Sequence, residues 1–209
     1  MDDTTKEDEK DLIPLKITLV GNSSVGKSSL INQFVNKIFV QTPIVTIGCD
    51  KFSRTEIINE QKIQLNLWDT AGQERFRSLS PMFLKNSNIV VLVYDITNEN
   101  SFEELQNYWL NMVKQNTQDI ILGIVANKSD LYEEEKVSEE KGRKFANEQK
   151  GYFFSTSAKN YTATEILFIS LAKEFLNKYS SYLNMSNNLN SNTSLSSYKI
   201  DKKNEKACC

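Results

Sequence analysis

The chain has 209 residues, of which 39% are hydrophobic, and its formal net charge is −2. This length and apolar content suit one folded domain with tails, and the balanced charge argues against a nucleic-acid-binding surface, which would carry a basic excess. The sequence contains no histidine, which excludes imidazole bases, Ser-His-Asp triads and histidine-bound zinc. The three cysteines, Cys49, Cys208 and Cys209, build neither a disulfide framework nor a zinc site, so a reducing compartment is expected.

Residues 1–12 are expected to form an acidic, disordered extension, because six carboxylates fall within the first eleven residues. This acidic start is unlike a signal peptide, and no apolar run reaches the ~20 residues that span a bilayer. We expect the folded domain over 13–180. A flexible tail is expected over 181–209, since a stretch rich in Asn and Ser cannot fill a core.

A phosphate-binding loop is the first motif along the chain. Residues 21–28 read GNSSVGKS, which is G-x-x-x-x-G-K-[ST], between the apolar run 17–20 and the helix-like segment 29–34. A strand, a glycine-permitted turn and a helix N-terminus in this order direct backbone N–H groups at phosphates. The Lys27 ammonium would contact the outer phosphates, and the Ser28 hydroxyl would hold Mg²⁺. The residues expected to bind nucleotide here are Ser23, Ser24, Val25, Gly26, Lys27, Ser28 and Ser29.

The remaining elements alternate between strands and helices. Strands are expected near 15–20, 51–58, 62–68, 89–94, 120–126 and 152–156, and helices after the phosphate loop, from about 101, near 138–149 and over 162–179. This alternation predicts an α/β fold, with a mostly parallel sheet, helices on both faces and the ligand at the carboxyl ends of the strands. A hairpin signal at residues 59–61 makes one edge strand antiparallel.

Two segments are expected to meet the phosphate loop. The loop 39–48 has no secondary-structure signal; Thr46 is expected to supply a second hydroxyl to Mg²⁺ and Phe39 to cover the base, with core packing as the alternative for Phe39. After the strand 62–68 comes DTAGQ, in which Asp69 would hold the metal through water and Gly72 would bring its N–H to a terminal phosphate. Gln73 would orient an attacking water.

The segment 124–130, IVANKSD, predicts the base specificity. The two oxygens of an ionised Asp130 match the neighbouring N1–H and N2–H₂ donors of guanine, and adenine has no such donor pair on that edge. The Lys128 stem would lie along the base plane, and Asn127 would tie loops together. After the last strand, Ser157, Ala158 and Lys159 would supply backbone N–H groups to the base.

These motifs resemble the Ras superfamily of small GTPases over about 15–178. The match is closest to the Rab family, on WDTAGQERFR at 68–77, YDITN at 94–98, Ile47-Gly48 and the Cys208-Cys209 pair, while the stretch 80–83 resembles endosomal Rabs. The resemblance implies the P-loop NTPase fold of a Ras-like G domain, with a six-stranded sheet and five helices. It also implies GTP/GDP and Mg²⁺ as ligands, Gln73 and Lys27 as catalytic residues, and switch segments at 39–48 and 70–84 that the γ-phosphate orders.

An effector-binding surface is implied as well, formed by Ile47, Gly48, Lys51, Trp68 and Phe83. Lys51 stands where Rabs commonly carry an aromatic residue, and Leu84-Lys85-Asn86 replaces the usual Tyr-Arg-Gly, so both departures bear on effector choice.

The Cys208-Cys209 pair looks like the double-cysteine end that Rabs carry for two geranylgeranyl chains. Lys199, Lys202, Lys203 and Lys206 nearby would add attraction to anionic lipid; an unmodified, solvated tail is the alternative. The resemblance implies a cytoplasmic monomer that is reversibly anchored to the cytosolic face of an endosomal or Golgi-type membrane. Its partners would be an activating protein, an exchange factor, a GDP dissociation inhibitor, Rab escort protein with its prenyltransferase, and GTP-dependent effectors, with no nucleic acid.

The predicted function is that of a GTP-binding and GTP-hydrolysing switch that regulates vesicle traffic through GTP-dependent effector binding. Hydrolysis is expected to be slow without an activating protein, because residues 36–50 contain no arginine to act in cis. Two alternatives remain open. One is a P-loop ATP-dependent enzyme, which Asp130 opposes, and the other is a nucleotide-locked binding module without turnover, which Gln73 opposes.

Overall fold

A computed structural model describes residues 12–41, 46–73 and 79–189. The expected acidic extension, apart from Leu12, lies outside these residues, as do Cys208 and Cys209 and the switch residues 42–45 and 74–78. The chain divides into two compact units, residues 1–175 and 176–209. The sheet and the motif residues belong to the first unit, and the described part of the second is the end of the last helix.

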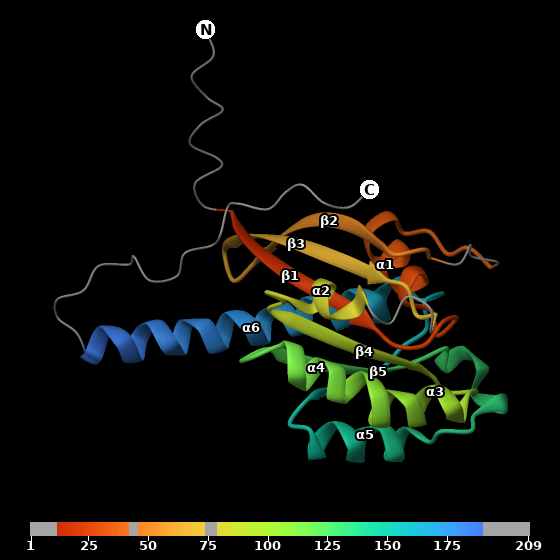
Figure 1. The fold of residues 1–209 in the computed structure, drawn as a ribbon. Coiled ribbons are helices and arrows are strands. Elements are labelled where there is room, and N and C mark those ends of the chain that lie inside the picture. Colours follow the sequence, from red (N-terminus) through yellow and green to blue (C-terminus); the bar gives the residue numbers. More distant parts are fainter. Residues whose placement is uncertain (1–11, 42–45, 74–78, 190–209) are drawn as a thin grey trace, which may run out of the picture. The chain divides into compact units, whose positions relative to one another are not determined.

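One sheet of six strands organises the first unit, in the order β2-β3-β1-β4-β5-β6 (Figure 1). All neighbouring strands are parallel except β2 and β3, so the predicted α/β sheet with one antiparallel edge strand is confirmed. Asn59 and Glu60, with φ of 51° and 65°, form the two-residue turn between β2 and β3. The strands are β1 (Ile13–Val20), β2 (Cys49–Ile58), β3 (Gln61–Thr70), β4 (Ile89–Asp95), β5 (Ile121–Asn127) and β6 (Tyr152–Ser155).

The helices follow the strands much as the pattern predicts. The described helices are α1 (Lys27–Asn36), α2 (Ser80–Leu84), α3 (Glu99–Glu104), the π-helical turn η2 (Leu105–Trp109), α4 (Leu110–Asn116), the 3₁₀ segment η3 (Ser129–Glu134), α5 (Glu139–Glu148) and α6 (Tyr161–Leu189). The described residues form six α-helices, one more than the five expected, and α3 and α4 follow one another through η2 without a break. The last helix is longer than the predicted range 162–179. It continues to Leu189, since neither Gly nor Pro interrupts this stretch.

The core lies on both faces of the sheet. Every residue of β4 is buried, as expected for a central parallel strand. On one face Tyr94 packs with Phe102 of α3 at 4.8 Å between ring centroids, and Phe102 packs with Phe145 of α5. On the other face Phe34 of α1 meets Phe168 of α6 at 4.6 Å.

Parallel strands bring the motifs to one edge of the sheet. The motif residues follow the carboxyl ends of β1, β3, β5 and β6, and these strands point the same way. Segments that are far apart in the sequence therefore meet where ligands bind in open α/β sheets.

Candidate functional site

A cavity of about 400 Å³ opens at the carboxyl edge of the sheet. Five predicted segments line it together: the phosphate loop, the loop after α1, the end of β3, the loop after β5 and the loop after β6. The predicted nucleotide contacts in its wall are Ser23, Ser24, Gly26, Lys27, Ser28, Ser29, Phe39, Thr46, Gly72, Asn127, Lys128, Asp130, Ser157, Ala158 and Lys159.

A few predicted residues lie outside the lining, and some lining residues were missed. Val25 is buried, and its carbonyl accepts a hydrogen bond from Asn127 Nδ2 at 2.7 Å. Asp69 and Gln73 are also outside the lining. Sequence reasoning missed four lining residues, whose only signal was that each lies within two positions of a predicted one: Val40, Gln41, Thr70 and Leu131.

Two glycines fix the course of the phosphate loop. Gly21 has φ of 146°, and a Cβ there would lie 2.2 Å from the carbonyl oxygen of Val93 on β4. Gly26 has φ of 99°, and a Cβ there would lie 2.2 Å from Asn127 Nδ2. Both positions combine a left-handed backbone with a close approach, so only glycine fits. The loop is thereby held against β4 and the segment after β5.

Lys27 stands at the start of α1 and is 5% exposed. Its ammonium donates to the carbonyls of Gly21 and Asn22, each at 2.8 Å. Burial lowers the pKa of Lys27 to about 8, and the charge of Asp69 opposes that shift only in part. An ammonium has three donors, so one remains beyond these two carbonyls for an anion in the cavity.

Two hydroxyls and one carboxylate converge beside Lys27. Ser28 Oγ lies 2.8 Å from Thr46 Oγ1 and donates to Asp69 Oδ2 at 2.5 Å, and Thr46 Oγ1 donates to the same oxygen at 3.1 Å. The other oxygen, Asp69 Oδ1, is buried and has no hydrogen-bond partner among the described residues. Burial raises the pKa of Asp69, against hydrogen bonds from Ser28 and Thr46 and the charge of Lys27. An oxygen-only set with an unsatisfied carboxylate oxygen fits Mg²⁺.

The opposite end of the cavity holds Asp130. Ser157 Oγ donates to Asp130 Oδ1 at 2.6 Å, and Lys159 Nζ contacts Oδ2 at 2.7 Å. Partial burial opposes ionisation of Asp130, but these two partners outweigh it and keep its pKa below the usual value. The Phe39 ring is 39% exposed and lies 5.9 Å from Lys159 Nζ, which fits a cover over this end better than core packing.

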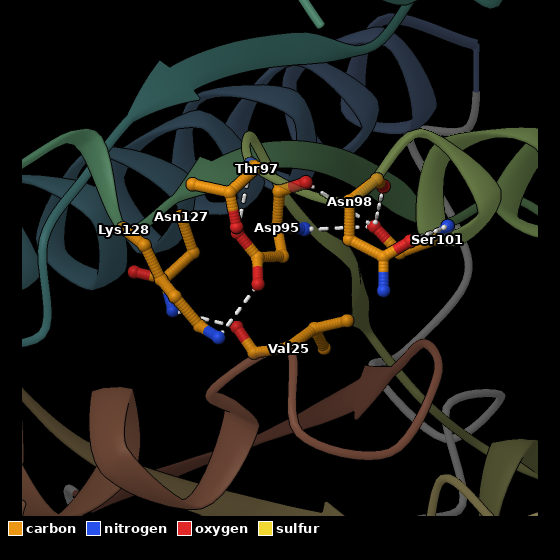
Figure 2. A network of polar contacts seen from close by, with 7 residues as sticks. All are labelled: Val25, Asp95, Thr97, Asn98, Ser101, Asn127 and Lys128. Atoms are coloured by element: carbon orange, nitrogen blue, oxygen red, sulfur yellow. Dashed lines mark hydrogen bonds and ion pairs between the residues drawn. The ribbon is translucent and has the colours of Figure 1, made fainter. Parts of the chain in front are cut away.

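Asn127 and Lys128 connect the two ends of the cavity. Besides its bond to Val25, Asn127 accepts a hydrogen bond from Thr156 Oγ1 at 3.3 Å, so it ties together the loops, as predicted. Lys128 has φ of 65° and pairs with Asp95 Oδ2 at 2.6 Å (Figure 2).

The predicted effector residues lie in the loop that precedes β2 and on β2, β3 and α2. Lys51 is opposite Trp68 in the β2–β3 register, and the Trp68 and Phe83 ring centroids are 6.4 Å apart. Ile47 is 78% exposed, whereas Phe83 is only 5% exposed and therefore offers little surface to a partner.

The departure at residues 84–86 is accommodated by the backbone. Leu84 is buried in the core, and Asn86 has φ of 59°. Asparagine tolerates the left-handed region that the usual glycine would occupy.

This fold and cavity define a class: a P-loop nucleotide-binding domain with a carboxylate at the end of the cavity opposite the phosphate loop. The model of the Ras family matches residues 16–177, so the chain belongs to the Ras family. It is 40% identical to Ras-related protein Rab-8B of Pongo abelii over 82% of this chain and 83% of that protein. It is 40% identical to Ras-related protein Rab-13 of Bos taurus over 92% and 94%, and 37% identical to Ras-related protein RABF2a of Arabidopsis thaliana over 77% and 80%.

Within the family the chain is a Rab small GTPase, a GTP-binding and GTP-hydrolysing switch in vesicle traffic. The alternatives of an ATP-dependent enzyme and of a module without turnover are not favoured. No helix in the described part of the chain has the length and apolar character that a bilayer-spanning segment needs.

Proposed function

We propose that the cavity binds GTP and GDP with the phosphates on the 21–29 loop and the guanine base against Asp130. The observation that carries this assignment is the pairing of Asp130 with Ser157 and Lys159, which favours its ionised form. A carboxylate held in this way presents acceptors only, which suits the two donors of guanine. Adenine has no such donor pair on that edge, so it would forgo these hydrogen bonds, and a site built on specific hydrogen bonds discriminates strongly against a ligand that lacks them.

Ser28, Thr46 and, through water, Asp69 are the residues that would hold Mg²⁺. When bound, the ion would offset negative charge on the phosphates during phosphoryl transfer. Lys27 would place its remaining N–H on the outer phosphates. Gly72 would present its backbone N–H to a terminal phosphate oxygen, and its Cα lies so close to the phosphate loop that a Cβ would fall 2.4 Å from Ser23 N.

Hydrolysis by this chain alone is proposed to be slow. Gln73 would orient the attacking water, but residues 36–50 supply no arginine to offset the charge of the transition state. An activating protein would supply that arginine and raise the rate on the order of 10³- to 10⁵-fold, as in the Ras and Gα cases from which this range comes. Single-turnover hydrolysis of bound GTP, with and without an activating protein, tests this proposal. Equal rates would contradict it.

The switch is proposed to act at a membrane. Cys208 and Cys209 would carry two prenyl chains and anchor the chain reversibly to the cytosolic face of an endosomal or Golgi-type membrane. Rab escort protein with its prenyltransferase, a GDP dissociation inhibitor and an exchange factor would complete the cycle. GTP-dependent effectors would bind the surface formed by Ile47, Gly48, Lys51 and Trp68, with the buried Phe83 packed beside Trp68.

The nucleotide assignment is tested by competition calorimetry in magnesium buffer. Purified protein is titrated with GTP, with ATP, and with GTP in the presence of excess ATP. We expect GTP to bind at least about 100-fold more tightly, because a site built on specific donors rejects a ligand that lacks them. The Glu140→Gln variant, changed at an exposed position of α5, serves as a control and should match the unmodified chain. Equal affinities for GTP and ATP would overturn the assignment.

A further inference from the structure

A buried carboxylate at the end of β4 holds one of the residues that line the cavity. Asp95 is the last residue of β4, and its side chain is 8% exposed, whereas that of Lys128 is 33% exposed. Asp95 Oδ2 lies 2.6 Å from Lys128 Nζ. Asp95 is also opposite Asn127 in the β4–β5 register, so the strand pairing places it beside the loop that carries Lys128.

Asp95 has its own fixed position, which Figure 2 shows. Its Oδ1 accepts hydrogen bonds from Thr97 N at 2.9 Å and from Thr97 Oγ1 at 2.8 Å. Its backbone N donates to Ser101 Oγ at 3.0 Å. Ser101 is held in turn by Asn98, whose Oδ1 caps α3 by accepting from Ser101 N at 3.2 Å. The two carboxylate oxygens therefore have separate contacts: Oδ1 with the turn after β4, and Oδ2 with Lys128.

This arrangement fixes the course of the Lys128 side chain. Asp95 holds the ammonium at the end of β4, so the aliphatic stem that leads to it is held in place within a residue that lines the cavity. A free lysine side chain samples many rotamers, and fixing one of them costs conformational entropy. Here the fixed carboxylate has already restricted those rotamers before a ligand arrives. Preorganisation of this kind increases affinity without adding a contact to the ligand.

We infer that Asp95 is a positioning residue of the nucleotide site, which acts through Lys128 by holding its stem in place for the purine ring. The inference rests on the proposed function, because it assumes that the base lies between the Asp130 end and the Lys128 stem. Asp95 contacts no ligand in this proposal. Its removal should therefore accelerate release of both GDP and GTP while leaving the guanine preference, which Asp130 provides, in place.

The first test compares Asp95→Asn with Glu99→Gln. The asparagine keeps the size of the side chain and an acceptor for Thr97, but it removes the charge that holds Lys128. Glu99 is a suitable control because it also pairs with a lysine, but neither partner lines the cavity. Its carboxylate lies 3.2 Å from Lys141 Nζ, and both side chains are about half exposed. Release of a fluorescent GDP analogue into excess GDP is followed in magnesium buffer. We expect about tenfold faster release from Asp95→Asn and no more than a twofold change from Glu99→Gln. Equal rates for Asp95→Asn and the unmodified chain would overturn the inference.

The second test asks whether the effect passes through Lys128. Lys128→Met keeps an unbranched apolar stem and removes the ammonium, so it should release the analogue faster by a similar factor. In the Lys128→Met background, Asp95→Asn should add less than a twofold change, because its partner is already gone. A full tenfold acceleration in that background would show that Asp95 only supports the end of β4, and would overturn the inference.

The outcomes separate this inference from the proposed function. If the unmodified chain does not bind the analogue, the proposed function fails; if it binds normally and the variants behave like Glu99→Gln, only the role of Asp95 fails. Should Asp95→Asn not fold, Thr97→Val replaces it, since it removes the Oγ1 bond to Asp95 Oδ1 and keeps every charge. We expect about threefold faster release from Thr97→Val, and an unchanged rate would count against the inference.

Discussion

At the scale of single residues, Lys27 shows how burial and charge compete in the site. Desolvation lowers its pKa to about 8, and the nearby Asp69 carboxylate restores the charge only in part. The hydrogen bonds to Gly21 and Asn22 keep the ammonium next to the cavity. Phosphates bound there would be opposite charges at short range, and such charges raise the pKa of an amine.

Nucleotide binding should therefore be coupled to proton uptake. At pH 8 about half of the nucleotide-free protein has a neutral Lys27, so binding should take up about half a proton there and almost none at pH 6. Affinity should consequently fall as the pH rises above 8. Calorimetry in two buffers with different ionisation enthalpies measures the uptake. Lys16→Met is the control, because Lys16 also has a pKa of about 8 but does not line the cavity. Identical heats in the two buffers at pH 8 would contradict the prediction.

Asp130 allows a prediction about base choice. Asp130→Asn replaces two acceptors by one acceptor and one donor, which suits xanthine, whose C2 carries a carbonyl instead of an amino group. We expect GTP to bind on the order of 100-fold more weakly and XTP to become the preferred ligand. Parallel titrations with GTP and XTP measure the change. A variant that still preferred GTP would show that Asp130 does not read the base.

At the scale of elements, the contact of α5 with β4 is tight at Gly142. A Cβ at Gly142 would lie 2.3 Å from Tyr94 Oη and 2.6 Å from a ring carbon of Phe153. Tyr94 Oη is buried and has no hydrogen-bond partner among the described residues. The helix α5 thus lies close to the sheet at the Tyr94 hydroxyl, and no hydrogen bond from the described residues offsets the burial of that hydroxyl.

Gly142→Ala sets helix propensity against packing. Alanine is favoured by about 1 kcal/mol in a helix, but overpacking a close contact costs about 1–3 kcal/mol. We expect a net loss of about 1 kcal/mol in the free energy of unfolding, measured by urea denaturation with saturating GDP. Tyr94→Phe in the same background removes one of the two close contacts and should recover part of the lost stability, because the contact with Phe153 remains. A stabilised Gly142→Ala variant would mean that α5 shifts freely on the sheet.

Local sequence patterns predicted most helices and strands. The features that could not be predicted depend on contacts between residues far apart in the sequence. The apolar runs predicted the ends of every strand to within about two residues, because a buried strand consists of consecutive apolar residues. No local sequence pattern predicted the π-helical turn η2. It ends at Trp109, whose indole N–H donates to Asn22 Oδ1 at 2.7 Å, and these residues are 87 positions apart. No local pattern encodes so distant a partner.

The site was predictable for a related reason. Its lining residues lie in short motifs directly after strands, and strand direction alone brings those motifs together. The Asp95–Lys128 pair was not predicted, although both residues lay within motifs that had been identified. Each position fitted its own segment, and only the pairing of β4 with β5 shows that the side chains meet.

At the scale of the whole molecule, one cluster links the two segments expected to switch. Thr46 belongs to 39–48, and Asp69 immediately precedes 70–84; both contact Ser28 at the start of α1. Ala71 N also donates to Gly48 O at 2.8 Å, which joins the two segments directly. A change at the phosphate end of the cavity would therefore act on both segments together, as a switch with a single readout requires.

Such a readout serves membrane traffic only if the chain is held at a membrane, and this makes the cysteine pair testable. We expect the double variant Cys208→Ser, Cys209→Ser to move from the membrane fraction to the cytosolic fraction of expressing cells. Each single variant should shift part of the way, because one lipid chain gives marginal binding and two give stable anchoring. Cys49→Ser is the matched control, since Cys49 lies at the start of β2, and it should stay on membranes. Fractionation with immunoblotting measures the distribution, and a double variant that remained membrane-bound would show that neither cysteine is the anchor.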